Sequence, residues 1–337
     1  MAQRITAPFA ATGAARHRRS RADAGPTDRS GSTADRLGRK PRIGHDRKDV
    51  LIALGLAAPM LLSVLAVSLY PVLKTLWLSF RDTSLQTQND RFTGLDNLQR
   101  LFNDEVFWKA WRQTIEFTAV TTAAETVLGL IIALALHTSF RGRGFVRAAV
   151  LVPWAIPTVV TSRMFGWLFD GQNGLVNYVL KQLHLIDHNV NFLGAPSLAL
   201  PTLMLADIWK TTPFMALLLL AGLQTIPAGL GEAARIDGAS TWQYFWRVRM
   251  PLLMPSLLIA ALLRALDAFR VFDLPYVLTA GGPASSTETM STISYKTLFS
   301  GLELGYGSTM ATAMFVTEVL IATGFGLFIV HRLRKGE

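Results

Sequence analysis

The chain has 337 residues, of which 50% are hydrophobic and 17% charged, and its formal net charge is +10. Its mean hydropathy of +0.32 is too high for a soluble domain with an ordinary polar surface, so the composition predicts an integral membrane protein. The chain has no cysteine, which excludes disulfides, iron–sulfur clusters and thiol nucleophiles, and its six histidines form no HExxH arrangement that would predict a catalytic zinc site.

Residues 1–49 carry most of the positive charge. They hold twelve Lys and Arg against five acids, and they are rich in Arg, Ser, Gly, Asp and Pro with few apolar side chains. Such a composition cannot bury enough apolar surface to order itself, so we expect a disordered basic tail in the cytoplasm. The rest of the chain is close to neutral, and nucleic-acid binding is therefore not expected.

The remaining sequence contains six apolar stretches of about 20 residues or more, the length that a helix needs to cross a bilayer. They lie near residues 50–73, 115–136, 147–169, 198–223, 255–279 and 306–331. We therefore predict an all-α polytopic membrane protein with six transmembrane helices. Its transmembrane domain would span residues 50–331, followed by a short cytoplasmic C-terminus at 332–337.

Lys and Arg residues indicate the orientation of these spans. They cluster directly before the first span and directly after the last, and the connection HTSFRGRGFVR between the second and third spans carries three Arg and no acid. Positive residues favour the cytoplasmic side, so both termini are expected in the cytoplasm. The Arg-, Ala- and Asp-rich tail suggests a high-GC bacterium, with the chain in its plasma membrane. The first external loop carries five Lys and Arg, balanced by five acids.

Ionisable residues inside the fourth and fifth spans form one polar face on each helix. With i, i+3, i+4, i+7 spacing, these faces hold Asp207, Lys210, Thr211 and Phe214 in the fourth span and Arg264, Asp267, Ala268 and Val271 in the fifth. Charged groups within a bilayer are costly and mark either a substrate path or a paired packing contact. Both faces reach the midplane, where transporters tend to bind substrate.

An alternative assigns the same charges to bracing. Asp207 with Lys210, and Arg264 with Asp267, have the i, i+3 spacing of neutralised pairs that stabilise helix packing. Three further charges stand alone within the predicted spans and would brace a partner or snorkel to the interface; they are Glu125, Arg147 and Arg163.

The connection between the fourth and fifth spans, residues 227–255, contains charged and apolar residues in helical spacing that is interrupted at Gly238. This pattern predicts two short amphipathic helices, with a turn at Gly238 because glycine tolerates positive φ. The periodicity alone fits equally well a helix that lies on the lipid headgroups, which Trp242 and Trp246 would suit.

Two motifs carry a resemblance to a known family. The segment EAARIDGASTWQYFWRVRMPLLMP resembles the EAA loop of binding-protein-dependent ABC importers, with Met250 in place of the usual Leu. The segment VLTAGGPASSTET, residues 277–289, is similar to the loop after the fifth span in carbohydrate permeases of the maltose and trehalose type, with Ala280 where a third glycine or a polar residue is usual. The resemblance covers roughly residues 50–331.

The resemblance implies a role for the loop at 227–255. In such importers the EAA loop is a coupling helix that docks into a cleft on the ATP-binding subunit. Glu232 would then be the polar anchor, and Ala233 and Ala234 would permit close approach. Asp237 completes the motif, and Gly238 would turn the second helix back towards the membrane.

The resemblance also implies a sugar path. The corresponding faces of the fourth and fifth spans line the sugar site in the maltose-type system, so Asp207, Lys210, Thr211, Phe214, Arg264, Asp267 and Val271 are the expected path residues. Carboxylate, ammonium and guanidinium groups suit the hydroxyls of a sugar. The charges of the two spans sum to zero when Arg270 and Asp273 are included, which favours a neutral disaccharide such as trehalose or maltose over glycerol phosphate.

The implied partners are a second homologous permease subunit, two ATP-binding subunits that hold ATP and Mg, an extracytoplasmic sugar-binding (lipo)protein, the sugar and membrane lipid. None of the eight lysines follows a glycine, so the chain lacks a P-loop. We therefore expect no catalytic residue, metal or cofactor in this chain. An ion-coupled secondary transporter is the alternative for the buried charges, although it does not explain the EAA loop. An intramembrane hydrolase would need a zinc site or a Gly-x-Ser-x-Gly elbow that the sequence lacks.

Overall fold

The computed structural model describes residues 47–335 of the chain. The chain divides into two units, Met1–Leu62 and Ser63–Glu337. The described residues of the first unit belong to helix α1 (Arg47–Val64). The predicted basic tail at 1–49 lies outside the described residues except for its last three, so its disorder stays a prediction.

The described part of the second unit is almost entirely helical, which confirms the predicted all-α class. In chain order after α1, its elements are η1 (Leu65–Leu69), α2 (Tyr70–Ser79), β1 (Arg81–Ser84), β2 (Asn89–Phe92), α3 (Asp96–Phe102), α4 (Glu105–His137), α5 (Arg143–Ala155), α6 (Thr158–Leu168), α7 (Leu175–Gln182), α8 (Pro196–Gln224), α9 (Gly229–Ile236), α10 (Thr241–Tyr244), η2 (Phe245–Arg249), α11 (Met250–Phe269), α12 (Asp273–Leu278), α13 (Met290–Tyr295), η3 (Lys296–Ser300) and α14 (Leu304–Lys335). The two strands form an antiparallel hairpin in which Arg81 pairs with Phe92.

Five helical segments of the described residues are long and apolar enough to cross a membrane, and a bent pair of helices makes a sixth candidate. Their positions match the six predicted spans, with ends that differ by several residues. The fifth segment, for example, runs from Thr241 to Leu278 rather than from residue 255. Helix α14 continues to Lys335, so no break in the helix marks the predicted boundary at residue 331.

The third predicted span, 147–169, corresponds to a bent pair of helices and not to one continuous helix. It consists of α5 and α6, which are bent by 87° at a short break. Ile156 adopts extended backbone angles (φ −73°, ψ 131°) directly before Pro157. Proline causes this break, because its ring disfavours the helical conformation of the preceding residue and it has no N–H to donate.

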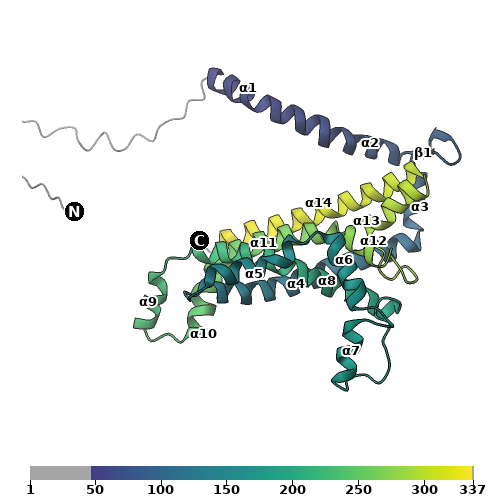
Figure 1. Ribbon diagram of the computed structural model, residues 1–337. Coiled ribbons are helices and arrows are strands. Elements are labelled where there is room, and N and C mark those ends of the chain that lie inside the picture. Colours follow the sequence, from purple (N-terminus) through teal and green to yellow (C-terminus); the bar gives the residue numbers. More distant parts are fainter. Residues whose placement is uncertain (1–46, 336–337) are drawn as a thin grey trace, which may run out of the picture. The chain divides into compact units, whose positions relative to one another are not determined.

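The core of the second unit forms where α4 packs along α8 and α11. Figure 1 shows these helices side by side in the bundle labelled α4, α8 and α11. Close approach of α4 to α8 depends on Gly129, since a Cβ atom there would lie 2.7 Å from Cγ of Met215. Apolar residues then fill the interface, including the fully buried Phe117, Leu203 and Leu219.

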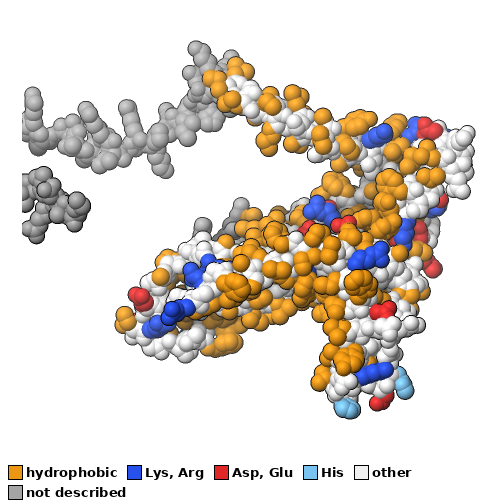
Figure 2. All heavy atoms as spheres, viewed as in Figure 1, with side chains coloured by type: hydrophobic (Ala, Val, Ile, Leu, Met, Phe, Trp, Pro, Cys, Tyr) orange, Lys and Arg blue, Asp and Glu red, His pale blue; other side chains and the backbone are white. Residues whose placement is uncertain are grey.

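Hydrophobic side chains also cover the outside of the helices, as Figure 2 shows along the bundle. Large residues such as Val127, Ile131 and Leu320 are more than half exposed. This is the reverse of a soluble protein surface, and it is typical of helices whose outer faces contact lipid.

Candidate functional site

A polar cavity of about 330 Å³ lies between the α5–α6 break, α8, α11 and α12. Its walls include Asp207, Lys210 and Thr211 of α8, together with Arg264 and Asp267 of α11. Helical spacing explains this arrangement, because residues at i, i+3 and i+4 share one face and the two faces meet. Cavities of roughly 300–1,000 Å³ are typical of small-molecule sites.

The remaining two path residues of the sequence prediction differ in position. Val271 lines the cavity, at its α12 side. Phe214 is not among the lining residues; its ring stacks on Trp154, with centroids 5.4 Å apart and planes 12° from parallel. Trp154 itself lines the cavity, so Phe214 supports an aromatic wall from behind. Whether substrate contacts these residues stays a prediction.

Arg264 is the centre of a buried charge cluster that joins three helices. Its guanidinium is 2% exposed and donates to Glu125 on α4 through Nε and Nη2, with 3.0 Å between Nη2 and Oε1. Nη2 also donates to Asp207 on α8, and Nη1 lies 3.1 Å from Oδ2 of Asp267. A buried arginine is tolerated in a membrane span when carboxylates compensate it in this way.

Only one of the two i, i+3 pairs that the bracing alternative predicted is present in this cluster. The i, i+3 pair of Arg264 with Asp267 is present. Asp207, however, pairs with Arg264 rather than with Lys210, whose Nζ donates instead to the backbone carbonyl of Trp154 at 3.5 Å. Lys210 is therefore available at the cavity, while Arg264 is committed to its neighbours.

Glu125 is not the lone charge that the sequence suggested. Its side chain is fully buried, pairs with Arg264 and accepts from Oγ1 of Thr211 at 2.6 Å. A signal for it exists in the sequence, because α4 carries a stripe of buried polar residues at helical spacing on an otherwise apolar span. The stripe consists of Gln113, Thr114, Thr118, Thr121, Thr122 and Glu125. Arg147 donates to the carbonyl of Leu136, and Arg163 is exposed.

Exposure separates the members of the cluster. The side chain of Asp267 is 70% exposed and that of Asp207 is 10% exposed. Asp267 therefore presents a carboxylate to the cavity, while Asp207 lies at its floor. The charged residues of the fourth and fifth spans sum to zero, and Glu125 changes this sum to −1; the other six are Asp207, Lys210, Arg264, Asp267, Arg270 and Asp273.

The loop at 227–255 forms the short helix α9 and, after Gly238, the four-residue helix α10. Helix α10 continues through η2 into α11, so the second predicted short helix is the start of the fifth long segment. Gly238 separates α9 from α10 with φ +78°, a left-handed value that glycine adopts without strain. A capping box starts α10: Ser240 Oγ accepts from the N–H of Gln243 at 3.2 Å, and Gln243 Oε1 accepts from the N–H of Ser240 at 2.8 Å. The turn and the cap fix the angle between the two helices.

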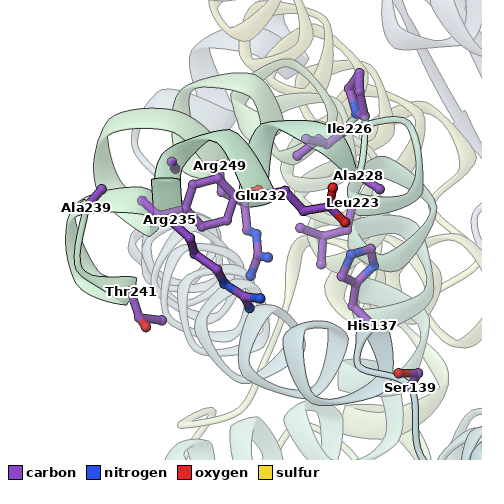
Figure 3. A pocket seen from close by; sticks show the side chains of 14 residues that line it. His137, Ser139, Leu223, Ile226, Ala228, Glu232, Arg235, Ala239, Thr241 and Arg249 are labelled. Atoms are coloured by element: carbon purple, nitrogen blue, oxygen red, sulfur yellow. The ribbon is translucent and has the colours of Figure 1, made fainter. Parts of the chain in front are cut away.

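The loop is exposed, and it encloses a second cavity of about 450 Å³ against the end of α4. Figure 3 shows the side chains of Glu232, Arg235, Arg249 and His137 around this opening. Neither α9 nor α10 contains a buried residue, and Ile236 is 86% exposed. Together with the exposed Trp242 and Trp246, this apolar exposure fits both alternatives of the sequence, contact with another protein and contact with lipid headgroups.

The second motif, residues 277–289, forms a loop that is anchored to α4. Lys109 Nζ donates to the carbonyl of Ala284 at 2.7 Å, and Gln113 Nε2 donates to that of Ser285 at 3.1 Å. Ala280, which departs from the family pattern, has φ +51°. This left-handed angle favours glycine, which is one of the two choices, glycine or a polar residue, expected at this position from the resemblance.

Comparison with known proteins gives concordant results. A family model described as binding-protein-dependent transport system inner membrane component matches residues 125–335. The chain is 42% identical to the trehalose/maltose transport system permease protein MalF of Thermococcus litoralis, over 77% of this chain and 86% of that protein. It is 39% identical to the trehalose transport system permease protein SugA of Mycobacterium tuberculosis, over 83% and 89% of the two chains.

A third relative is the sulfoquinovosyl glycerol transport system permease protein SmoG of Agrobacterium fabrum, 36% identical over 82% of this chain and 89% of that protein. Among solved structures, a chain of a bacterial ABC transporter involved in the import of alginate superposes with a TM-score of 0.74 at 21% identity. That match covers 86% of this chain and 99% of the other. The likeness confirms the predicted polytopic fold.

Proposed function

Because the chain belongs to the family of inner-membrane components of binding-protein-dependent transport systems, we propose that it is a permease subunit of an ATP-driven sugar importer. It forms half of the translocation path for a disaccharide such as trehalose or maltose. Family membership supports this function over the alternative of an ion-coupled secondary transporter.

The polar cavity beside α8 and α11 is the observation that carries the proposal. Asp267 offers carboxylate acceptors, Lys210 offers ammonium donors and Thr211 offers a hydroxyl at the same cavity. Sugar hydroxyls both donate and accept, so this mixed set suits them. Two relatives named for trehalose or maltose transport support a disaccharide.

The exposed helix pair at 227–255 supports coupling to a separate ATPase. Its rigid turn at Gly238 and its exposed Ile236 provide a lever with an apolar contact. We expect Glu232, Ala233 and Ala234 at the contact with the ATP-binding subunit. ATP and Mg would be bound there, and this chain would hold no cofactor of its own.

The proposed assembly contains a second homologous permease, two ATP-binding subunits and an extracytoplasmic sugar-binding (lipo)protein. The family description, which refers to a binding protein, supports the last of these. Both termini lie in the cytoplasm of the bacterium, as the Lys and Arg distribution favours, and this places the loop at 227–255 on the side where ATP is available.

A sulfonated glycoside is a second candidate substrate, because the SmoG relative is named for sulfoquinovosyl glycerol and because Lys210 and Arg270 line the cavity. The net charge of −1 over the seven charged residues Glu125, Asp207, Lys210, Arg264, Asp267, Arg270 and Asp273 argues against an anionic ligand. Competition between the two classes of sugar therefore decides the substrate.

Reconstitution of the complete transporter in proteoliposomes tests the proposal. With ATP on the side of the membrane where the ATP-binding subunits lie, we expect uptake of labelled trehalose or maltose. Excess sulfonated glycoside should reduce this uptake only weakly. Uptake driven by a potassium-diffusion potential without ATP would contradict ATP coupling. Uptake of the sulfonated glycoside alone would replace the disaccharide as substrate.

A further inference from the structure

Glu125 lies on α4 outside the cavity, yet its carboxylate contacts two residues that line it. Oε1 accepts from Nη2 of Arg264 at 3.0 Å and from Oγ1 of Thr211 at 2.6 Å, and Oε2 accepts from Nε of Arg264. The side chain is fully buried and is absent from the cavity wall. Glu125 therefore has no direct contact with the cavity, and Arg264 and Thr211 are the cavity residues to which it is hydrogen-bonded.

The hydrogen bonds of Arg264 show what Glu125 controls. A guanidinium has five N–H groups. Two of them point to Glu125, one to Asp207 and one to Asp267. The two bonds to Glu125 form a fork that fixes the plane of the guanidinium, and the fifth N–H is the one that remains. Arg264 therefore acts mainly by orienting carboxylates.

Asp267 is the carboxylate that this arrangement directs towards the cavity. It takes its described hydrogen bond from Nη1 of Arg264, and its side chain is 70% exposed. A rotation of the guanidinium would move Nη1 and with it the position of Asp267. Thr211 responds as well: its single proton faces Glu125 Oε1 and the carbonyl of Asp207, both at 2.6 Å, so its lone pairs are free to accept.

We infer that Glu125 is a positioning residue for ligand recognition, which acts from α4 through Arg264 to hold Asp267 in place at the cavity. The inference rests on the proposed function, because it takes the sugar to be bound where Asp267 is exposed. A purely bracing role for Glu125 would hold α4 against α11 without affecting affinity for the sugar.

A single reporter thiol distinguishes positioning from bracing. The chain has no cysteine, so Thr158→Cys places one thiol at the cavity wall. In the purified complete transporter, the rate at which this chain's thiol is alkylated is measured against the concentration of trehalose or maltose. The sugar concentration that halves the alkylation rate is the half-protecting concentration, and the variant with Thr158→Cys alone gives its reference value.

Glu125→Gln is expected to raise the half-protecting sugar concentration about tenfold, because the amide keeps the shape but loses the charged fork on Arg264. Glu125→Asp, which keeps the charge, is expected to recover part of this loss. Glu116→Gln is the matched control, since it makes the same change on an exposed residue of the same helix and should shift the midpoint less than about twofold.

The route through Asp267 is tested by a double-mutant cycle. Once Asp267→Asn has removed the oriented carboxylate, addition of Glu125→Gln should change the midpoint little further. Fully additive shifts would overturn the inference. An unchanged midpoint in Glu125→Gln with less assembled complex would also overturn it and show bracing alone.

Three remaining outcomes also decide the question. If Glu125→Gln does not assemble, a raised midpoint in assembled Glu125→Asp supports the inference and an unchanged one overturns it. If neither sugar slows alkylation of the Thr158→Cys reference while the complex still transports it, the sugar binds elsewhere and the inference falls. If the complex without any substitution transports neither sugar, the proposed function falls with it.

Discussion

The charge cluster around Arg264 and the loop at 227–255 are both rich in polar groups, but they differ in where their partners lie. Arg264 is 2% exposed and finds three carboxylates within its own chain. The loop has no buried residue in α9 or α10 and exposes Ile236. The charges of the first region are paired within this polypeptide, whereas the second region leaves apolar side chains exposed, and we propose that another polypeptide covers them.

Substitution of Arg264 should give the largest effect. Arg264→Met leaves Glu125 and Asp207 buried without a cation, at a cost of about 3–5 kcal/mol. We expect little monodisperse protein by size-exclusion chromatography in detergent. Arg270→Met is the control, because the guanidinium of Arg270 is 56% exposed and its pair with Glu318 is worth about 0–1 kcal/mol. Equal yields of monodisperse protein for Arg264→Met and Arg270→Met would show that the buried cluster is not needed for folding.

Changes in the loop should abolish transport and leave folding intact. Gly238→Pro cannot adopt φ +78°, because proline fixes φ near −65°, and Glu232→Lys reverses the charge of the proposed anchor. Sugar uptake and recovered complex are measured in the same preparation. Gly229→Ala, where an added Cβ meets nothing within 4 Å, should transport normally. Normal uptake by Gly238→Pro would remove the loop from the mechanism.

Exposed members of the cavity should behave differently from Arg264. Lys210→Met and Asp267→Asn each remove a charged hydrogen-bonding group at the cavity, and we expect uptake to fall roughly tenfold. Assembly should be retained, since Asp267 is 70% exposed and Lys210 bonds only a backbone carbonyl in the described structure. Lys181→Met on the exposed face of α7 is the control. Poor assembly of Asp267→Asn would make Asp267 a brace like Asp207.

The loop at 277–289 is intermediate between the two regions, because it is partly exposed but hydrogen-bonded to α4 of the same chain. Ala280→Gly should raise the free energy of unfolding by about 0.5–1 kcal/mol, because relief of the left-handed strain exceeds the entropy that glycine adds to the unfolded chain. A thermal melt of the purified protein measures the change. Ala228→Gly, at φ −59°, should lower stability or leave it unchanged.

Local patterns in the sequence predicted much of this structure. Apolar length located the spans, and glycine and helical spacing located the two helices of the loop. The i, i+3 rule placed Asp267 beside Arg264. The contact of Glu125 with Arg264 joins residues 139 positions apart, and such a pair depends on which helices pack together, information that spacing within one helix does not contain. The break at Pro157, by contrast, was visible in the sequence and was missed because hydropathy averages over it.

Next to the break between α5 and α6, the backbone carbonyl oxygen of Trp154 accepts a hydrogen bond from a cavity residue. The carbonyl of Trp154 lies one turn before the break and accepts from Lys210 Nζ. Every residue type carries this oxygen, so no replacement of the Trp154 side chain deletes it. Replacement of Trp154 by alanine would remove the ring that stacks on Phe214, but it would leave the carbonyl that accepts from Lys210 unchanged. Substitutions that change substrate preference can therefore replace the side chains around Trp154. The carbonyl oxygen of Trp154 stays in place as long as Pro157 keeps the backbone bent.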